Sequence, residues 1–239
     1  TWKQVQYWEN SITLFKHTLK HTSNNAIMHN NLGVAYNDSG KYKEAIEELK
    51  QAIRIVPDYA MAHSNLGVAY NDSGKYKEAI EVCKKSIRIN PDYAKAHFNL
   101  GVAYGESGMY KEAIEASKKA IKIDPDYAMA HSNLGIAYGE SGMYKEAIEA
   151  SKKAIRIDPD YAKAHYNLGY AYLSSSMHKE AIDVYRQVIR IEPDSAKAHF
   201  GLGYAYVLSN DRDSAIEQYK ILKSLDPELA NRLFNQIYK

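Results

Sequence analysis

Cysteine is almost absent from this chain, since Cys83 is the only one among 239 residues. A single thiol excludes an internal disulfide and a metal site built from several cysteines. Long apolar runs are lacking too, because no segment approaches the roughly 18 apolar residues that a membrane span requires. No signal-peptide pattern opens the chain. We therefore expect no direct insertion of this segment into a membrane.

An excess of charge of one sign is also lacking. The 31 basic and 29 acidic residues leave a formal net charge of +2. Because no block of lysine and arginine stands out, we expect no nucleic-acid partner. No nucleophile–base pair, glycine-rich phosphate loop or carboxylate pair occurs outside the repeats described next. The sequence therefore predicts a protein that is not an enzyme and needs no cofactor.

Proline is scarce, and its six copies are strictly spaced. They lie 34 residues apart, at Pro57, Pro91, Pro125, Pro159, Pro193 and Pro227. A fixed period of about 20–50 residues is typical of a stacked repeat array, whose units bury their apolar faces against their neighbours. The spacing therefore predicts one elongated core in place of one or two globular domains.

Each repeat carries two helical patterns of apolar residues, separated by a turn. In the third repeat, Leu100 and Tyr104 belong to the first pattern, and Tyr110 and Ile114 to the second. Gly108 lies between the patterns, and glycine adopts the left-handed conformation that ends a helix at little cost. Each proline is expected to begin the next helix pair, because proline fits the first turn of a helix but not its interior.

The turn residue changes in the last two repeats. Asn210 takes the glycine position in the sixth repeat, where asparagine is a tolerated substitute. Ser176 takes it in the fifth repeat and is a poorer substitute, so we predict a distorted turn there.

Glycine recurs inside the first helical pattern as well. The six copies are Gly33, Gly67, Gly101, Gly135, Gly169 and Gly203. A glycine inside a helix costs about 1 kcal/mol relative to alanine. Its repetition predicts that two helix backbones approach closely at this position.

The pattern of Leu-Gly, a tyrosine three residues on, two alanines and a proline resembles the tetratricopeptide repeat family. The resemblance divides the chain into six repeats, at residues 26–59, 60–93, 94–127, 128–161, 162–195 and 196–229. It implies an all-α fold, in which antiparallel helix pairs stack into a right-handed α-solenoid. The first helices of the pairs would line a concave groove.

Both ends fit this scheme. Residues 1–25 align with the second half of a repeat and predict a leading helix, with core positions at Trp8, Ser11, Ile12, Phe15 and Leu19. Residues 230–239 predict a capping helix, since a terminal unit needs a polar outer face. Its expected inward residues are Leu233, Phe234 and Ile237, and its outward ones Asn231, Arg232, Asn235, Gln236 and Lys239. The total is fourteen helices.

Six histidines share one register position, at His29, His63, His97, His131, His165 and His199. A metal site needs its ligands within about 4 Å of one another. One histidine per repeat places neighbours a whole repeat apart. We therefore interpret the position as a packed one between helices and predict no metal site.

An asparagine precedes each Leu-Gly pair except the last. The file is Asn31, Asn65, Asn99, Asn133 and Asn167, and it is broken at Gly201. An amide offers donors and an acceptor, so a row of amides suits the backbone of an extended peptide. The file resembles the asparagine ladder that lines the superhelix of O-GlcNAc transferases. The alternative is that the amides brace neighbouring repeats.

Other groove positions vary and are expected to carry specificity. They change from polar and acidic residues in the first repeats to aromatic ones in the last two. The predicted apolar anchors are Phe98, Tyr166, Tyr170, Phe200 and Tyr204. An exposed patch of this kind is typical of a partner surface. A protein or peptide partner and a second copy of the chain, in a homo-oligomer, are both open as its occupant.

These observations predict an interaction scaffold that holds an extended peptide or a partner helix in its groove. The alternative comes from residues 1–33, which resemble the junction between membrane region and repeats in bacterial relatives of the O-mannosyltransferases. That resemblance implies an accessory extracytoplasmic domain of a membrane-bound glycosyltransferase-like protein. A cytoplasmic location is the other alternative.

Overall fold

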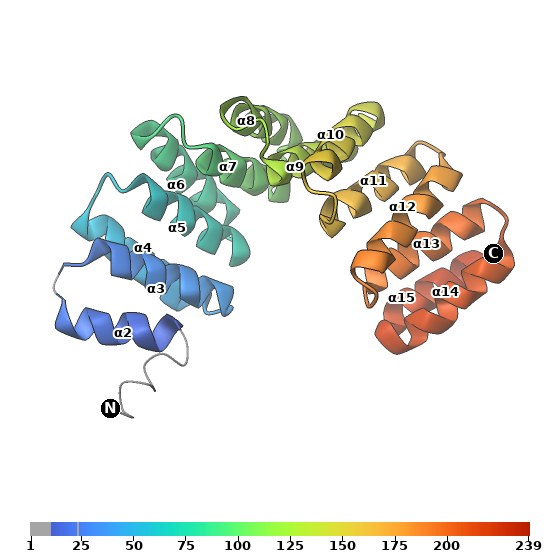
Figure 1. Ribbon diagram of the computed structural model, residues 1–239, viewed down its shortest axis with the longest axis horizontal. Coiled ribbons are helices and arrows are strands. Elements are labelled where there is room, and N and C mark those ends of the chain that lie inside the picture. Colours follow the sequence, from blue (N-terminus) through green and yellow to red (C-terminus); the bar gives the residue numbers. More distant parts are fainter. Residues whose placement is uncertain (1–10, 23) are drawn as a thin grey trace. The chain divides into compact units, whose positions relative to one another are not determined.

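The computed structural model describes residues 11–22 and 24–239. This part of the chain forms fourteen helices and no strand (Figure 1). One helix leads, twelve form six pairs and one closes the array, which confirms the predicted all-α solenoid of helix-turn-helix repeats. The proposed core residue Trp8 lies outside the described residues. Every described helix is too short or too polar to span a bilayer.

The six pairs have nearly constant lengths. The first helices are α3 (Ala26–Asp38), α5 (Ala60–Asp72), α7 (Ala94–Glu106), α9 (Ala128–Glu140), α11 (Ala162–Ser174) and α13 (Ala196–Leu208). The second helices are α4 (Tyr42–Ile55), α6 (Tyr76–Ile89), α8 (Tyr110–Ile123), α10 (Tyr144–Ile157), α12 (His178–Ile191) and α14 (Arg212–Leu225). The leading helix is α2 (Ser11–His21), and the closing helix is α15 (Pro227–Ile237).

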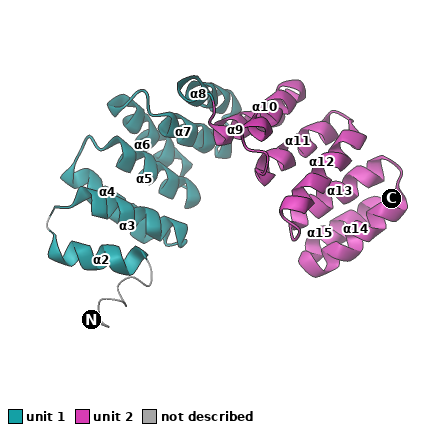
Figure 2. Ribbon diagram, in the orientation of Figure 1, with its two compact units in different colours: residues 1–125 teal, residues 126–239 magenta. Residues whose placement is uncertain are grey.

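The helices form two compact units, residues 1–125 and 126–239 (Figure 2). In the first unit, neighbouring first helices contact each other, α3 with α5 and α5 with α7. In the second unit, α9 contacts α11, α11 contacts α13, and α13 contacts the closing helix α15. Each unit therefore presents a face made of consecutive first helices.

Each unit has its own hydrophobic core. The core of the first unit includes Leu32, Leu49, Leu66, Cys83 and Leu100. The core of the second unit includes Leu168, Tyr185, Leu202, Leu222 and Leu233. Leu32, Leu66 and Leu100 recur at the repeat period, as do Leu168 and Leu202, so each helix pair buries apolar area against the next pair.

Glycine allows the predicted close approach within pairs such as α3–α4 and α9–α10, whereas the side chain nearest to Gly203 is Leu233 of α15. A Cβ added to Gly33 would lie 2.6 Å from Cγ of Leu49, and one added to Gly135 would lie 2.6 Å from Oγ of Ser151. Real Cβ atoms do not come that close to their neighbours. The second helix therefore occupies the space that a side chain on the first helix would need.

A cation over a tyrosine ring links the second helix of one repeat to the first helix of the next. In the first unit, Nζ of Lys50 lies 5.7 Å from the ring centroid of Tyr70. In the second unit, the guanidinium of Arg186 lies 5.8 Å from the Tyr206 ring and also donates to its hydroxyl, at 2.8 Å. The repeated tyrosine of the sequence thus serves contacts between repeats.

The turn at Ser176 is not distorted, contrary to the prediction. Ser176 has a φ of 60°, against 74° for Gly108 in the third repeat. Met177 N donates to Tyr172 O at 2.9 Å, and Met109 N donates to Tyr104 O at the same distance. Serine therefore adopts the left-handed conformation, with the strain that this carries for a residue with a Cβ.

The prediction that each proline begins a helix pair is wrong for five of the six. Pro57 lies in the turn that follows α4, and α5 begins three residues later at Ala60. The locked φ and missing N–H of proline suit this turn as well as a helix start. Pro227 alone begins a helix, where the Asp226 side chain accepts from the N–H groups of Glu228 and Leu229.

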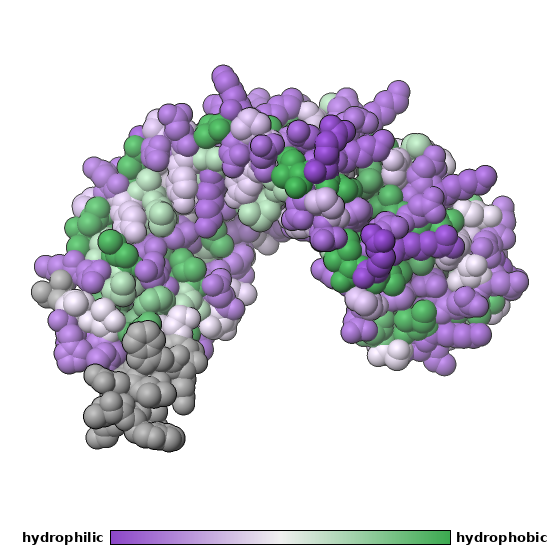
Figure 3. Space-filling view, viewed as in Figure 1, coloured by the Kyte–Doolittle hydropathy of each residue, from purple (hydrophilic) through white to green (hydrophobic). Residues whose placement is uncertain are grey.

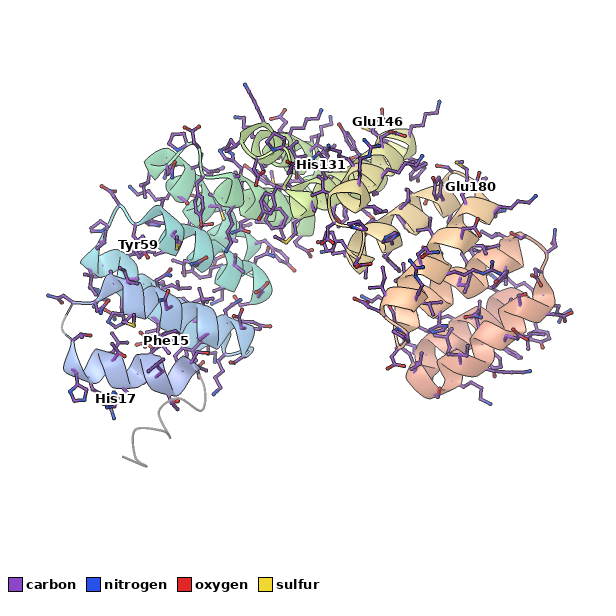
Figure 4. The ribbon with its side chains drawn as sticks, in the orientation of Figure 1. Phe15, His17, Tyr59, His131, Glu146 and Glu180 are labelled. Atoms are coloured by element: carbon purple, nitrogen blue, oxygen red, sulfur yellow. The ribbon has the colours of Figure 1, made fainter. Side chains whose placement is uncertain are left out.

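The terminal helices largely match their predicted faces. On α2, Ile12, Phe15 and Leu19 pack against the core of the first unit, and Phe15 points toward α3 in Figure 4. Ser11, predicted for the core, is exposed at the start of the helix.

On α15, Leu233 and Ile237 are buried, but Phe234 is 41% exposed and does not pack inward as predicted. One residue further along a helix is rotated by about 100° from the buried face. The Phe234 ring instead lies beside the rings of Tyr219 and Tyr238, with centroids 5.5 Å and 4.5 Å away.

Candidate functional site

The repeated histidines hold the turns that lead into the first helices. Nε2 lies 2.8–2.9 Å from the carbonyl oxygen of the proline six residues earlier in four repeats, at His63, His97, His165 and His199. A carbonyl oxygen only accepts, so Nε2 donates. The described residues include no cluster of His, Cys, Asp or Glu that is arranged to hold a metal ion.

Cys83 is unsuited to nucleophilic chemistry. It is fully buried between helices, and burial raises the pKa of its thiol to about 12. The thiolate is the reactive form, so this residue stays inert near neutral pH.

The asparagine file links neighbouring first helices. Asn65 Nδ2 donates to Oδ1 of Asn30 at 2.9 Å. Asn99 Nδ2 donates to Oγ of Ser64, also at 2.9 Å. Each acceptor lies 35 residues earlier, in the preceding repeat. The bracing role that the sequence left open is therefore present.

The same arrangement occurs in the second unit, where Asn167 Nδ2 donates to Oγ of Ser132 at 2.9 Å. The Oδ1 atoms of Asn65, Asn99 and Asn167 accept no hydrogen bond from a described residue. Each of these amides thus retains an acceptor after it has braced its neighbour.

The amides differ in exposure. Asn65 and Asn99 are 8% and 7% exposed, whereas Asn31, Asn133 and Asn167 are half-buried. In the first unit, Asn31 and Asn65 line a cavity of about 760 Å³ on the first-helix face. At these two positions the file therefore borders open space.

Four of the five predicted aromatic anchors gather in the second unit. Tyr166 and Tyr170 lie one turn apart on α11, and Phe200 and Tyr204 lie one turn apart on α13. The Phe200 and Tyr204 rings are stacked, with centroids 6.3 Å apart. The fifth, Phe98, is half-buried on α7 in the first unit.

These aromatic residues border two cavities. Phe200 and Tyr204 line one of about 860 Å³ together with Arg232, whose guanidinium lies 5.0 Å from the Phe200 ring centroid. Tyr166 and Tyr170 line another of about 270 Å³. Figure 3 shows hydrophobic side chains of the second unit exposed among hydrophilic ones.

Sequence reasoning missed Tyr185, which lies beneath this face. Its ring comes from α12 and passes between Gly169 and Gly201, where added Cβ atoms would lie 2.9 Å and 2.6 Å from its Cζ. Its ring also meets Tyr166 edge to face, with centroids 5.7 Å apart. Burial raises the pKa of the Tyr185 phenol, so the group stays neutral.

Tyr185 explains why the asparagine file stops at Gly201. The equivalent residues in earlier repeats are smaller, namely Leu49, Cys83, Ser117 and Ser151. A large ring at this position requires a residue without a side chain opposite it. The signal was present in the sequence as two departures from the repeat, 16 residues apart.

Family models match most of the chain. A model described as TPR repeat matches residues 35–72, 69–108, 106–142 and 137–176. Two models described as tetratricopeptide repeat match residues 162–195 and 196–229. None of the curated proteins matches the chain significantly.

Solved structures share the fold. Cut9, in the APC/C hetero-tetramer Cut9–Hcn1, is 18% identical, with a TM-score of 0.85 over 95% of this chain and 46% of that one. This chain thus spans less than half of it. MamA is 30% identical, with a TM-score of 0.58 over 70% of this chain and 97% of MamA. YrrB, described as a TPR protein with an unusual peptide-binding site, is 22% identical, with a TM-score of 0.56 over 77% of this chain and 95% of YrrB.

Proposed function

This chain belongs to the tetratricopeptide repeat family, and on that premise we propose that it is a scaffold that binds an extended segment of a partner protein. Proteins of this family generally mediate protein–protein interactions. The segment would lie along the first-helix face of each unit. No catalytic family matches the chain, in keeping with a role that is not enzymatic.

The observation that carries the proposal is the set of unused amide oxygens. One N–H of each bracing amide donates to the preceding repeat, at Asn65, Asn99 and Asn167, and this hydrogen bond fixes the orientation of the amide. The remaining oxygen of each amide suits a backbone N–H of an extended peptide. Because backbone groups are common to all sequences, the amides would bind without selecting side chains.

The aromatic residues would supply the affinity for particular side chains. Tyr170 is 44% exposed, and Phe200 and Tyr204 are half-buried beside a cavity. Aromatic side chains bury large areas with few rotatable bonds to immobilise, so they dominate many interfaces. A second copy of the chain is the alternative occupant, and sedimentation of the full chain tests for it.

The asparagine proposal is tested by one pair of variants on a peptide array. We expect Asn99→Ala to weaken binding of unrelated peptides alike, because it removes a contact to the peptide backbone. The control is Ser64→Ala, which removes the bond from Asn99 Nδ2 to the Ser64 hydroxyl. It leaves the Asn99 oxygen in place, together with the longer contact of Nδ2 to the Ser64 carbonyl oxygen, at 3.5 Å, which still orients the amide. Each variant should cost about 1 kcal/mol of stability, so folding is checked by circular dichroism.

The two variants separate the two roles of the amide. Equal binding losses in Asn99→Ala and Ser64→Ala would mean that the amide only braces the repeats. Unchanged binding in both would exclude this part of the face as the peptide site.

A second candidate follows from the resemblance of residues 1–33 to the junction in O-mannosyltransferase relatives. The chain would then be an accessory domain outside the cytoplasm, beside a membrane-bound glycosyltransferase-like region. Fractionation of the full-length gene product tests this candidate. Its recovery wholly outside the membrane fraction would contradict it.

A further inference from the structure

The smaller cavity of the second unit has a lining unlike the rest of the first-helix face. It has a volume of about 270 Å³ and lies between α9 and α11. Its lining includes Ile136, Gly139, Glu140, Tyr166, Asn167 and Tyr170. We propose that this cavity receives a lysine or arginine side chain of the bound segment. The inference rests on the proposed function and adds the chemical class of one partner residue.

Two tyrosine rings and a glycine shape the cavity. A Cβ added to Gly139 would lie 3.8 Å from Cε1 of Tyr170, an ordinary van der Waals distance, so the ring leaves room for a methyl group above the backbone of α9. Tyr166 lies on the same face of α11, one turn before Tyr170. Its ring packs edge to face against the buried ring of Tyr185. The π faces of such rings attract cations.

Among the described residues, Glu140 is the one charged residue in the lining of the cavity, and the positive charge of Arg232, in the lining of the neighbouring cavity, also reaches the Tyr166 phenol. Glu140 is exposed at the C-terminal end of α9 and forms no ion pair with a described residue. The carbonyl end of a helix adds partial negative charge at the same place. Asn167 contributes a further acceptor, because its Nδ2 is committed to Ser132.

A cation is the side-chain class that gains from all of these groups at once. A carboxylate would be repelled by Glu140, and an apolar side chain would gain no attraction from the Glu140 carboxylate, which is exposed to solvent. The neighbouring cavity of the same unit differs, since Arg232 and Lys239 line it and α11 has Ser174 in the register position of Glu140. The basic side chain is therefore assigned to the smaller cavity.

The test uses the full chain and two blocked pentapeptides. One has lysine between pairs of glycines, and the other has norleucine, which lacks the charge, in place of the lysine. Titrations are followed by NMR in ¹⁵N-labelled protein. We expect the lysine peptide to shift the amide signals of Gly139 and Tyr170 saturably, and to bind at least tenfold more tightly than the norleucine peptide.

Variants assign the effect to the proposed groups. We expect Glu140→Gln and Tyr170→Leu each to weaken the lysine peptide at least fivefold. Tyr170→Phe should retain binding, because phenylalanine keeps the π face. The matched control is Glu180→Gln, which removes the same charge on α12 (Figure 4) and should leave affinity unchanged.

Three outcomes would overturn the inference: equal affinity for the norleucine peptide, equal losses in Glu140→Gln and Glu180→Gln, or no saturable shift in α9 and α11. These failures differ from a failure of the proposed function. If Asn99→Ala weakens array binding but array peptides show no preference for basic residues, the scaffold function stands and the cation cavity fails. If the lysine peptide binds and Asn99→Ala changes nothing, the cavity stands and the backbone contact fails.

Discussion

Tyr185 and Gly201 show how one residue can alter a repeat without breaking it. The Tyr185 ring is 1% exposed and lies between two glycines, so it has no room to move aside. The ring fills the position that smaller residues hold in earlier repeats. Glycine therefore replaces the asparagine of the file at position 201, because a side chain there would meet the ring. The two departures from the repeat are therefore one structural change.

This coupling predicts the effect of a single methyl group. We expect Gly201→Ala to destabilise the protein by about 1–3 kcal/mol, because its Cβ would lie 2.6 Å from the Tyr185 ring. Alanine gains about 1 kcal/mol of helix propensity, which reduces the loss but does not cancel it. Urea denaturation of each variant measures the change.

A double-mutant cycle provides the control. Tyr185→Ser together with Gly201→Asn restores the pair found earlier in the array, Ser117 with Asn133 in the third and fourth repeats and Ser151 with Asn167 in the fourth and fifth. We expect the double variant to be more stable than the sum of the two single changes predicts. Strict additivity would show that the two sites are independent.

At the scale of the element, the helix-ending turns depend on one left-handed residue. Ser176 adopts a φ of 60° where most repeats have glycine, and L-residues with a Cβ are strained there. We expect Ser176→Gly to stabilise the protein by about 0.5–1 kcal/mol. Thermal unfolding followed by circular dichroism measures the effect.

The neighbouring serine is the matched control. Ser175 has a φ of −97°, which any residue adopts without strain. Ser175→Gly should therefore give no stabilisation, because it only adds freedom to the unfolded chain. If both variants raise the midpoint equally, strain at Ser176 is not the cause.

The helices were predictable because their cause is local. Apolar residues at helical spacing, with a turn residue between two such patterns, determine each helix pair, and the period repeats that information six times. The turns at the prolines were not predictable in the same way, because the locked φ of proline is compatible with both a helix start and a turn. Pro57 lies in a turn that His63 stabilises from six residues away, and no spacing rule indicates that hydrogen bond.

The candidate site was predictable in part. The positions of Tyr166, Tyr170, Phe200 and Tyr204 followed from register alone, and the structure brings them together in one unit. The bond of Asn99 to Ser64 did not follow, since it depends on how two helices 35 residues apart pack. The sequence predicted only that groove positions before the last two repeats are polar or acidic, which includes Glu140. It did not predict that Glu140 lies beside two tyrosine rings, because that depends on tertiary packing.

At the scale of the whole molecule, stability in a repeat array is approximately a sum of unit and nearest-neighbour terms. Helix α15 closes the second unit by burying Leu233 and Ile237 against α13 and α14. Its removal deletes one such interface and leaves distant interfaces in place. We therefore expect the backbone amides near α15 to lose protection against hydrogen exchange, and the amides of distant repeats to keep it.

Deletion of residues 230–239 tests this expectation. We expect faster hydrogen exchange in α13 and α14 and a greater tendency to aggregate, because the apolar surface beneath Leu233 becomes exposed. Exchange in α3 to α6 should stay unchanged, since the first unit keeps its own core. Asn231→Ala is the control, because Asn231 is exposed on the same helix. A truncated chain with unchanged exchange in α13 and α14 would show that α15 does not cap the array, and an equal loss in both units would show that the array unfolds as one body.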